Sequence, residues 1–372
     1  MMPEAGPGGP GRPAHDASGE PGGTMRAVVV ERFGEAPRVA EVPDPACPAD
    51  GVVVRVEATG LCRSDWHAWM GHDDGVTLPH VPGHELAGTV VEVGPQVRSW
   101  REGDRVTVPF VCACGTCAAC LAGEQQVCER QEQPGFTHAG SFAERVALHH
   151  ADVNLVRLPD AVSAATAASL GCRFATAYRA LMVHGRIRAN DRVVVHGCGG
   201  VGLSAVMIAA AGGARVVAVD VSPAALDAAR DAGAEAVVDA AGLSPEDVAA
   251  RVVEATDGGA HVSVDALGAR ATAVASVLGL RRRGRHVQVG LLLAGDERTP
   301  LPMDRVIAWE LELYGSHGMA AHEYPPMLDA VAAGVLRPDR LVTREIGLNE
   351  LPDALAAMGT GAGAPGMTVV VP

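Results

Sequence analysis

Four cysteines in one short stretch carry the most specific chemical pattern of this sequence. Cys114, Cys117, Cys120 and Cys128 follow a C-x2-C-x2-C-x7-C spacing. Four thiolates so close along a chain can close tetrahedrally around one zinc ion, and such a site leaves no coordination position open for a substrate. Disulfides between these near neighbours would be strained. The spacing therefore predicts a structural zinc site, with a register that uses Cys112 in place of Cys114 as the alternative.

Two further thiols and one imidazole could bind a second metal ion. Cys62 lies in GLCRSDWH, His84 in PGHE and Cys172 in SLGCR. Together they offer the two-cysteine, one-histidine ligand set of a zinc site that keeps its fourth position open. Spacing alone does not join segments so far apart. Each residue taken singly is more often structural, as a buried cysteine or a loop histidine.

A glycine-rich turn, GCGGVG at 197–202, lies between the apolar run DRVVVHG and the small-residue run GVGLSAVMIAAAGG. A strand before and a helix after are the context in which such a turn binds a dinucleotide. The glycines allow a tight turn, close approach of backbone to a pyrophosphate and close packing of helix on strand, with the phosphates at the helix N-terminus. The predicted cofactor-binding glycines are Gly197, Gly199, Gly200 and Gly202.

Asp220 indicates which dinucleotide the turn would bind. It ends the next strand, ARVVAVD, near the spacing of about 20 residues expected for the carboxylate that binds the adenosine ribose. A carboxylate repels a 2′-phosphate, and no Arg or Lys follows it at 221–223. The sequence therefore favours NAD over NADP. A plain glycine turn with Asp220 as a helix cap is the alternative.

Composition limits the class of protein. The 372 residues include 30 Lys and Arg against 44 Asp and Glu, and the net charge of −14 disfavours nucleic acid and acidic membrane surfaces as partners. The apolar runs are interrupted before they could span a bilayer. Nine cysteines without a preceding signal-peptide pattern favour metal binding in a reducing compartment over a disulfide framework. We expect a cytoplasmic protein with a small-molecule partner, no nucleic acid and no membrane.

Two kinds of pattern must position these residues. From Met25, short β-branched runs separated by Gly, Pro and Asp predict a β-rich domain. From about Asp191, strands alternate with helices, and this alternation predicts a parallel sheet that continues to about Tyr314. Two of the helices are predicted to begin at Ser-Pro. The last stretch, with a helix and the strand MTVVVP, returns to the first domain. The predicted parts are a disordered extension at 1–24, a catalytic domain at 25–173 with a cysteine lobe at about 112–130, a cofactor domain at 174–314 and the return at 315–372.

The G-H-E segment, the cysteine lobe and the G-x-G-G-x-G turn together resemble the zinc-dependent alcohol dehydrogenases of the medium-chain dehydrogenase/reductase (MDR) superfamily, from Met25 onward. The resemblance implies an α/β fold: a GroES-like β-rich catalytic domain plus a Rossmann domain with a doubly wound parallel sheet. It implies reversible NAD-linked oxidation of a primary or secondary alcohol to an aldehyde or ketone, by hydride transfer from a zinc-bound alkoxide. It also implies two zinc ions per subunit, one catalytic and one structural, and a homodimer or homotetramer.

The same resemblance assigns roles to single residues. Cys62, His84 and Cys172 would bind the catalytic zinc, Asp65 would orient the histidine, and Glu85 would be a nearby carboxylate that can approach the metal. Ser64, which keeps the hydroxyl of a threonine found in many members, would bind the substrate hydroxyl, and His67 would pass the proton to solvent through the cofactor ribose. The implied cofactor contacts are Arg63 at the pyrophosphate, Thr176 and Val201 beside the nicotinamide, and the backbone of Val289 at its carboxamide.

Some positions depart from the family pattern. Residues 222–225 lack the lysine that some members place after the ribose-binding acid, and Met367 stands where some carry a basic residue. Arg281, Arg282 and Arg283 are predicted at a helix C-terminus, where they would complement the dipole. Cys47 and Cys198 are expected to be small packed residues.

Two other functions stay open at this point. A polyol or sugar-alcohol dehydrogenase would keep the same fold. Trp66 and Trp69 could form an apolar pocket wall that favours simple alcohols, or pack within the β-rich domain. A dinucleotide-binding relative without catalytic metal is the third possibility, and such relatives usually lack Cys62, the His84–Glu85 pair and the cysteine lobe, all of which are present.

Overall fold

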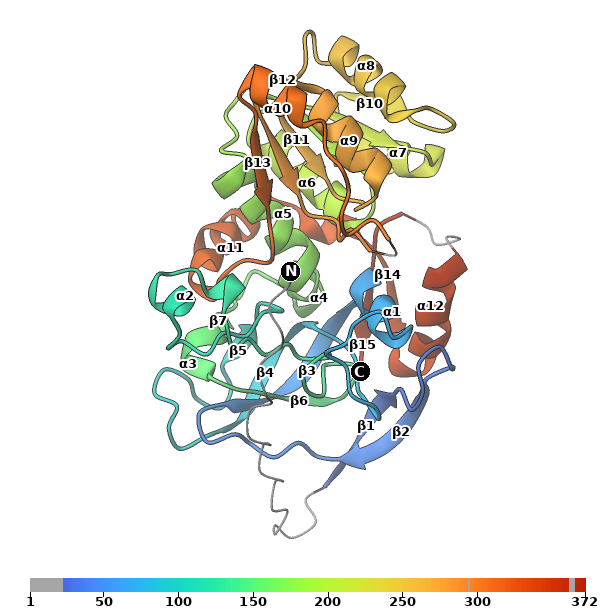
Figure 1. The fold of residues 1–372 in the computed structure, drawn as a ribbon. Coiled ribbons are helices and arrows are strands. Elements are labelled where there is room, and N and C mark those ends of the chain that lie inside the picture. Colours follow the sequence, from blue (N-terminus) through green and yellow to red (C-terminus); the bar gives the residue numbers. More distant parts are fainter. Residues whose placement is uncertain (1–22, 294, 361–364) are drawn as a thin grey trace, which may run out of the picture.

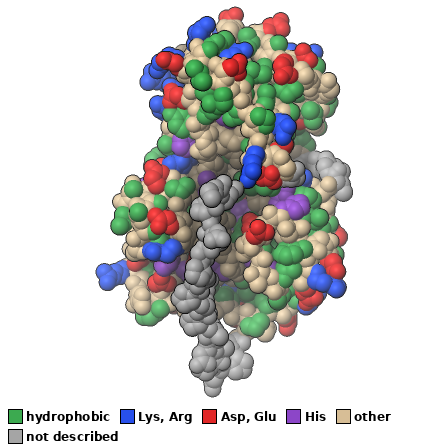
Figure 2. All heavy atoms as spheres, in the orientation of Figure 1, with side chains coloured by type: hydrophobic (Ala, Val, Ile, Leu, Met, Phe, Trp, Pro, Cys, Tyr) green, Lys and Arg blue, Asp and Glu red, His purple; other side chains and the backbone are tan. Residues whose placement is uncertain are grey.

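The computed structural model describes residues 23–293, 295–360 and 365–372. The predicted disordered extension therefore lies, except for its last two residues, outside the described residues. Thr24 already belongs to the first strand. Two lobes stand one above the other in Figure 1, and Figure 2 shows them in the same view as rounded bodies joined at a narrower waist. Within the described ranges, no helix is both long and apolar enough to cross a membrane.

The upper lobe is a six-stranded parallel sheet in the order β10-β9-β8-β11-β12-β13. Valines of β8 alternate between its two faces, with Val193 and Val195 in one apolar cluster and Val194 in another. Helix α6 packs beside α7, and α8 packs against α9. The α/β fold class is confirmed. The strands are β8 (Arg192–His196), β9 (Arg215–Asp220), β10 (Ala236–Asp239), β11 (Ala260–Asp265), β12 (Leu280–Gln288) and β13 (Glu312–Gly315), and the helices are α6 (Gly200–Ala211), α7 (Pro223–Ala232), α8 (Pro245–Ala255), α9 (Arg270–Leu278) and α10 (Met303–Trp309).

The strand order places a topological switch between β8 and β11. In open sheets of this kind, ligands bind outside the carboxyl ends of the strands at that point. The glycine turn and Asp220 both lie at carboxyl ends, after β8 and at the end of β9. Ser222 and Ser244 cap their helices as predicted, since each hydroxyl accepts a backbone N–H three residues on.

The prediction for the three arginines is wrong. Arg281, Arg282 and Arg283 lie in strand β12, because α9 ends at Leu278 and Leu280 already pairs with Ala260 of β11. Arg282 lies 5.1 Å from the ring centre of Trp309, and its Nη1 lies 3.5 Å from the carbonyl oxygen of Ala308, in the last turn of α10 rather than of α9. Arg283 forms an ion pair with Glu310.

The lower lobe is built on a seven-stranded sheet in the order β14-β15-β3-β4-β5-β7, with β6 also paired to β3. The last strand, β15, lies between β14 and β3, so the C-terminal stretch shares a sheet with residues near the start of the chain. The strands are β3 (Val52–Leu61), β4 (Glu85–Val93), β5 (Arg105–Thr107), β6 (Arg145–Leu148), β7 (Val156–Arg157), β14 (Val342–Gly347) and β15 (Met367–Val371), with a separate antiparallel pair β1 (Thr24–Val29) and β2 (Arg38–Pro43).

Short helices surround this sheet and connect it to the upper lobe. The segment from α4 through η2 to α5 lies at the junction of the two lobes in Figure 1. Two π-helical turns flank α5, η2 (Leu170–Phe174) before it and η3 (Ala180–His184) after it, a geometry that is frequent at functional sites. The other helices are α1 (Arg63–Trp69), α2 (Ala118–Leu121), η1 (Gln125–Val127), α3 (Ala151–Asn154), α4 (Ala164–Ala168), α5 (Ala175–Arg179), η4 (Ala321–Glu323), α11 (Tyr324–Ala332), η5 (Pro338–Leu341), η6 (Leu348–Glu350), α12 (Leu351–Ala357) and η7 (Met358–Thr360).

Candidate active site

The fold brings together three ligand groups that are far apart in sequence. Strands β3 and β4 are antiparallel with Gly60 opposite Glu85, so Cys62 after β3 and His84 before β4 come to the same end of the sheet. Cys172 reaches them from the π-helical turn η2. The ligand atoms of Cys62, His84 and Cys172 all lie within 4.8 Å of one another. This three-residue group can hold a metal ion and leave a coordination position open.

Asp65 fixes the orientation of the histidine. Its Oδ1 accepts the Nδ1–H of His84 at 2.9 Å and the backbone N–H of Gly83 at 3.2 Å, and its Oδ2 accepts the N–H of Cys62 at 2.8 Å. With the proton on Nδ1, the Nε2 lone pair of His84 is free, and that atom is buried without a hydrogen-bond partner among the described residues. A buried lone pair beside two thiols fits a divalent cation such as zinc.

Electrostatics at the group favour a thiolate. The side chain of Cys172 lowers the pKa of Cys62 well below its usual range, with help from His84 and Arg173 and against the effect of burial. Burial lowers the pKa of His84, but Asp65 and Cys62 raise it by more, so the net direction is upward. Because thiolates rather than thiols bind metals, the surroundings prepare Cys62 as a ligand.

Glu85 is fully engaged by other groups. The guanidinium of Arg173 forms an ion pair with its carboxylate, and the Nε of Arg173 lies 3.2 Å from Oε1. The backbone N–H groups of Cys172 and Arg173 donate to the same oxygen at 3.2 and 3.0 Å. Burial raises the pKa of this carboxyl group, and Arg173 opposes that rise. The sequence assigned no role to Arg173, although it adjoins a predicted ligand.

The two predicted proton-transfer residues lie on α1. Ser64 is next to the metal group, with its Oγ 3.7 Å from the Sγ of Cys62. The Nδ1 of His67 lies 3.0 Å from the Nδ1 of His72, and its ring packs edge-on against Trp66. Burial, with Arg63 and His72, lowers the pKa of His67. This shift favours the neutral form of His67, which can accept a proton.

The tryptophans beside this helix pack within the lower lobe. Trp69 is only 7% exposed, and its indole N–H donates to the backbone carbonyl of Glu35 at 2.6 Å. Trp66 packs against the same apolar cluster and against Gly359. Of the two interpretations made from sequence, packing describes these side chains.

The glycine turn has the shape that a pyrophosphate requires. Gly197 has a φ of 88°, which favours glycine, and a side chain at Gly202 would collide with the carbonyl of Gly197. Nothing lies within 4 Å of the position that a Cβ of Gly199 would occupy, so its backbone is open to a ligand. The carboxylate of Asp220 accepts the N–H of Cys198 at 2.7 Å, which places it directly beneath the turn.

The other predicted cofactor contacts lie on surrounding elements. Thr176 donates its hydroxyl to the carbonyl of Cys172 at 2.6 Å, and Val201 lies in the first turn of α6. The N–H of Val289, just after β12, donates to the carbonyl of Asp265 at 3.0 Å. The guanidinium of Arg63 donates to the carbonyl of Met358 and lies 4.4 Å from the ring centre of Trp66.

The structure also brings together the thiols of the four-cysteine cluster, which are those of Cys114, Cys117, Cys120 and Cys128. Its sulfur atoms lie within 4.8 Å of one another, so these four thiols can hold one metal ion. Hydrogen bonds from Thr116 to its sulfur lower the pKa of Cys114 to about 5. Cys112, the alternative ligand, instead packs in the core of the β-rich sheet, where burial raises its pKa.

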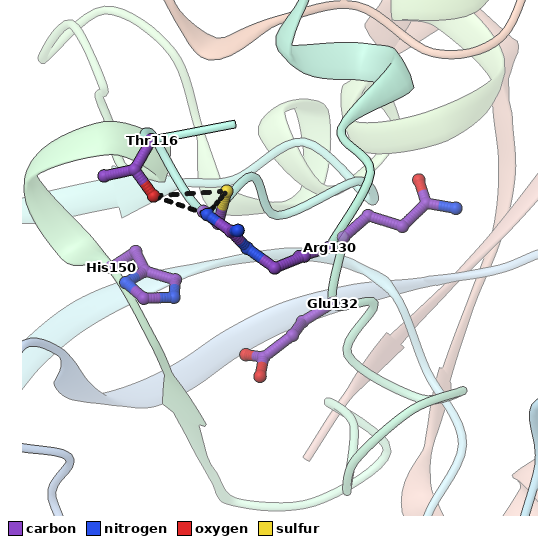
Figure 3. Close-up of a pocket in the computed structure, with 6 residues that line it drawn as sticks. Thr116, Arg130, Glu132 and His150 are labelled. Carbon is purple, nitrogen blue, oxygen red and sulfur yellow. Dashed lines mark hydrogen bonds between the residues drawn. The ribbon is translucent and has the colours of Figure 1, made fainter. Parts of the chain in front are cut away.

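A cavity of about 570 Å³ borders this cluster. In Figure 3 the guanidinium of Arg130 points toward Thr116, with Glu132 and His150 around the same hollow. The Nη2 of Arg130 lies 3.3 Å from the Sγ of Cys114 and 2.6 Å from the Oγ1 of Thr116. A cation at this distance offsets part of the negative charge that four thiolates would carry.

Comparisons with known proteins agree with this geometry. The family model "Alcohol dehydrogenase GroES-like domain" matches residues 48–160, and the model "Zinc-binding dehydrogenase" matches residues 200–333. An alcohol dehydrogenase of Geobacillus stearothermophilus is 37% identical over 298 residues, which cover 78% of this chain and 84% of the relative. A D-arabitol-phosphate dehydrogenase of Enterococcus avium is 32% identical over 83% of this chain and 87% of its own. The solved alcohol dehydrogenase TADH from Thermus sp. ATN1 superimposes with a TM-score of 0.83 at 32% identity, over 93% of this chain and 99% of that one.

Proposed function

Because the chain belongs to the zinc-type alcohol dehydrogenases of the MDR superfamily, and is an oxidoreductase, we propose that it oxidises a primary or secondary alcohol reversibly to an aldehyde or ketone with NAD. The observation that carries the proposal is the group formed by Cys62, His84 and Cys172, whose orphan Nε2 faces two thiols. The glycine turn and Asp220 supply the second requirement, a dinucleotide site.

Zinc, NAD and the side chains of the protein would each supply a different part of the reaction. Held by Cys62, His84 and Cys172, zinc would supply a Lewis acid that lowers the pKa of a hydroxyl group, and NAD would supply the hydride acceptor. Asp65 keeps the proton of His84 on Nδ1. Ser64 would accept the substrate's hydroxyl proton, a role supported by the distance of 3.7 Å between its Oγ and the Sγ of Cys62.

His67 would complete the path of the proton to solvent. Its lowered pKa favours the neutral form, and its Nδ1 lies 3.0 Å from the Nδ1 of His72. No hydrogen bond joins Ser64 to His67 within the described part of the chain, so a cofactor ribose between them, as the resemblance implies, would complete the relay. Thr176, Val201 and Val289 would contact the nicotinamide, and Arg63 the pyrophosphate once it leaves the carbonyl of Met358.

NAD is the proposed cofactor because of Asp220. Its carboxylate lies under the glycine turn, where it would accept the ribose hydroxyls and repel a 2′-phosphate. The four-cysteine cluster would hold the second, structural zinc. A homodimer or homotetramer, a cytoplasmic location and the domain limits at residues 173 and 314 stay predictions.

A polyol or sugar-alcohol substrate is the second candidate. It is favoured by the D-arabitol-phosphate dehydrogenase among the relatives and by the packing of Trp69, which removes one argument for an apolar pocket wall. A substrate panel of short aliphatic alcohols, benzyl alcohol, a polyol and a polyol phosphate separates the two, with both NAD and NADP.

The test of the function combines metal analysis with NAD-linked absorbance change on that panel. Two zinc ions per chain with turnover are expected. Cys62→Ser should reduce turnover to background while NADH binding persists, and Cys47→Ser, a cysteine outside both metal groups, is the matched control. Undiminished turnover in a Cys62→Ser protein that contains only one zinc would contradict the proposed mechanism.

A further inference from the structure

Arg173 occupies a place that neither predicted metal nor cofactor contact accounts for. It follows Cys172 in η2, and only 6% of its surface is exposed. Turn η2 packs against both β4, which begins with Glu85, and α6, which begins at the glycine turn. An arginine is rarely so buried without specific partners.

Its first partner is Glu85. Two nitrogen atoms of the guanidinium contact the two carboxylate oxygens, in the forked arrangement that fixes both groups in plane. The two backbone N–H groups of η2 bind the same carboxylate. Glu85 is thereby held in one orientation beside the metal group.

Its second partner is the dinucleotide turn. A Cβ placed on Gly200 would lie 2.6 Å from the Cδ of Arg173 and 3.4 Å from its Nη1. On the other side, a Cβ on Gly60 of β3 would lie 2.9 Å from Nη2. The guanidinium therefore fills the space between the β-rich sheet and the start of α6, and it needs glycine on both sides.

The charge of Arg173 lies between two parts of the molecule. On one side it pairs with the carboxylate of Glu85, beside the three-residue group. On the other side it lies against the N-terminal end of α6, a 12-residue helix, where the unpaired N–H groups and the helix dipole already favour an anion. No second buried cation contacts Gly200 among the atoms nearest to it in the described chain.

We propose that Arg173 is a positioning residue that couples the metal group to the dinucleotide turn, by holding Glu85 in place with one edge of its guanidinium and supporting Gly200 and the bound pyrophosphate with the other. The inference rests on the proposed function. As a consequence, a change at the three-residue metal group alters the dinucleotide turn, and the reverse, without any movement of the domains.

The test uses the full-length protein with cobalt in the three-residue group, because the visible bands of cobalt report its coordination. Arg173→Met keeps a stem of similar length beside Gly200 but removes the guanidinium, and with it the positive charge and the hydrogen bonds to Glu85. Arg173→Lys keeps the charge but loses the fork. Arg179→Met is the matched control. Arg179 is equally buried in the same helical segment, but it pairs with Glu124 and Glu323 instead. NADH binding is measured by fluorescence. The cobalt absorption spectrum is recorded separately, without cofactor, so neither readout depends on turnover.

We expect Arg173→Met to weaken NADH binding about tenfold or more and to shift the cobalt bands before any cofactor is added. Arg173→Lys should recover part of the NADH affinity but not the wild-type bands. In the double variant Glu85→Gln/Arg173→Met, the bands should move back toward those of the wild type while NADH binding stays weak, because no carboxylate remains to be displaced. If Arg173→Met misfolds, Arg173→Lys and the double variant carry the test.

Two results separate the possible failures. If the wild-type protein binds neither cobalt at the three-residue group nor NADH, the proposed function fails. If it binds both and Arg173→Met changes them no more than Arg179→Met does, or changes only one of the two, the coupling role of Arg173 is refuted and the function stands.

Discussion

Replacing Asp65 by asparagine tests how the metal group is built. The carboxylate is fully buried and accepts three N–H groups, from Cys62, Gly83 and His84. An asparagine has one oxygen and one NH2, so it cannot accept on both sides. If the oxygen faces His84, the NH2 opposes the N–H of Cys62. If the amide is reversed, His84 must accept at Nδ1, and its proton moves to Nε2, the atom that would bind the metal.

The size of the effect follows from these contacts. A buried N–H left without an acceptor destabilises the fold by about 1–3 kcal/mol. Loss of the group that orients a ligating histidine weakens metal binding by about 10–100-fold, which corresponds to about 1.4–2.8 kcal/mol. We therefore expect Asp65→Asn to bind zinc at the three-residue group at least tenfold more weakly, with a smaller change at the four-cysteine cluster.

The assay is a chelator competition that resolves the two zinc ions, with the four-cysteine cluster as internal reference. Asp104→Asn is the matched control, since Asp104 is also buried and accepts a backbone N–H, from Arg101, but lies in an ion pair with Arg157. Asp104→Asn should lower the stability of the fold and leave the zinc affinities of both sites unchanged. Asp65→Asn with a zinc affinity within twofold of the wild type would refute the role assigned to the carboxylate.

Three further predictions concern the cofactor, the relay and the cysteines. Asp220→Asn should weaken NAD binding about tenfold and reduce the preference of the protein for NAD over NADP, because charged hydrogen bonds to the ribose are lost. Calorimetry measures the affinity for both cofactors, and an unchanged ratio of the two affinities would contradict the role given to Asp220. Arg63→Met should raise the pKa of His67 toward 6.5, because the charge of Arg63 contributes, after burial, to lowering that pKa in the native protein. NMR of labelled histidines measures the titration midpoint of His67, and a midpoint that stays the same or falls would contradict an effect of Arg63. Cys120→Ser should leave one zinc per chain and lower the unfolding temperature while the three-residue group keeps its metal, whereas two retained zinc ions would argue against the four-cysteine cluster as a metal site.

Local sequence patterns were enough to predict much of the fold and the grouping of residues at two of the candidate sites. The glycine turn depends on neighbouring residues in one segment, so its strand, turn and helix could be predicted together. The spacing of the four-cysteine cluster is equally local. The structure brings Cys114 together with the other three thiols and packs Cys112 in the core of the β-rich sheet. The Ser-Pro helix starts follow from one capping hydroxyl and one proline each.

Contacts that depend on register and on long-range packing could not be predicted in the same way. The pairing of Arg173 with Glu85 requires the alignment of β4 beside η2 and a π-helical turn, and neither leaves a periodic signal. The same applies to Arg63, whose partner is the carbonyl of Met358, nearly 300 positions along the chain. For Arg281–Arg283 the error lay in the helix end, since a strand that begins directly after Gly279 leaves no room for a last helical turn.

The place of β15 has a consequence for how the chain folds as it is synthesised. Strand β3, which leads into Cys62, pairs along one edge with β15, which is synthesised after every strand of the upper lobe. The sheet of the lower lobe is therefore incomplete until β15 has been synthesised, while the strands and helices from β8 to β13 emerge as one uninterrupted unit. The dinucleotide-binding lobe can therefore complete its fold first, although most of the metal-binding lobe is synthesised before it. The sheet of the metal-binding lobe is then completed beside a lobe that is already folded.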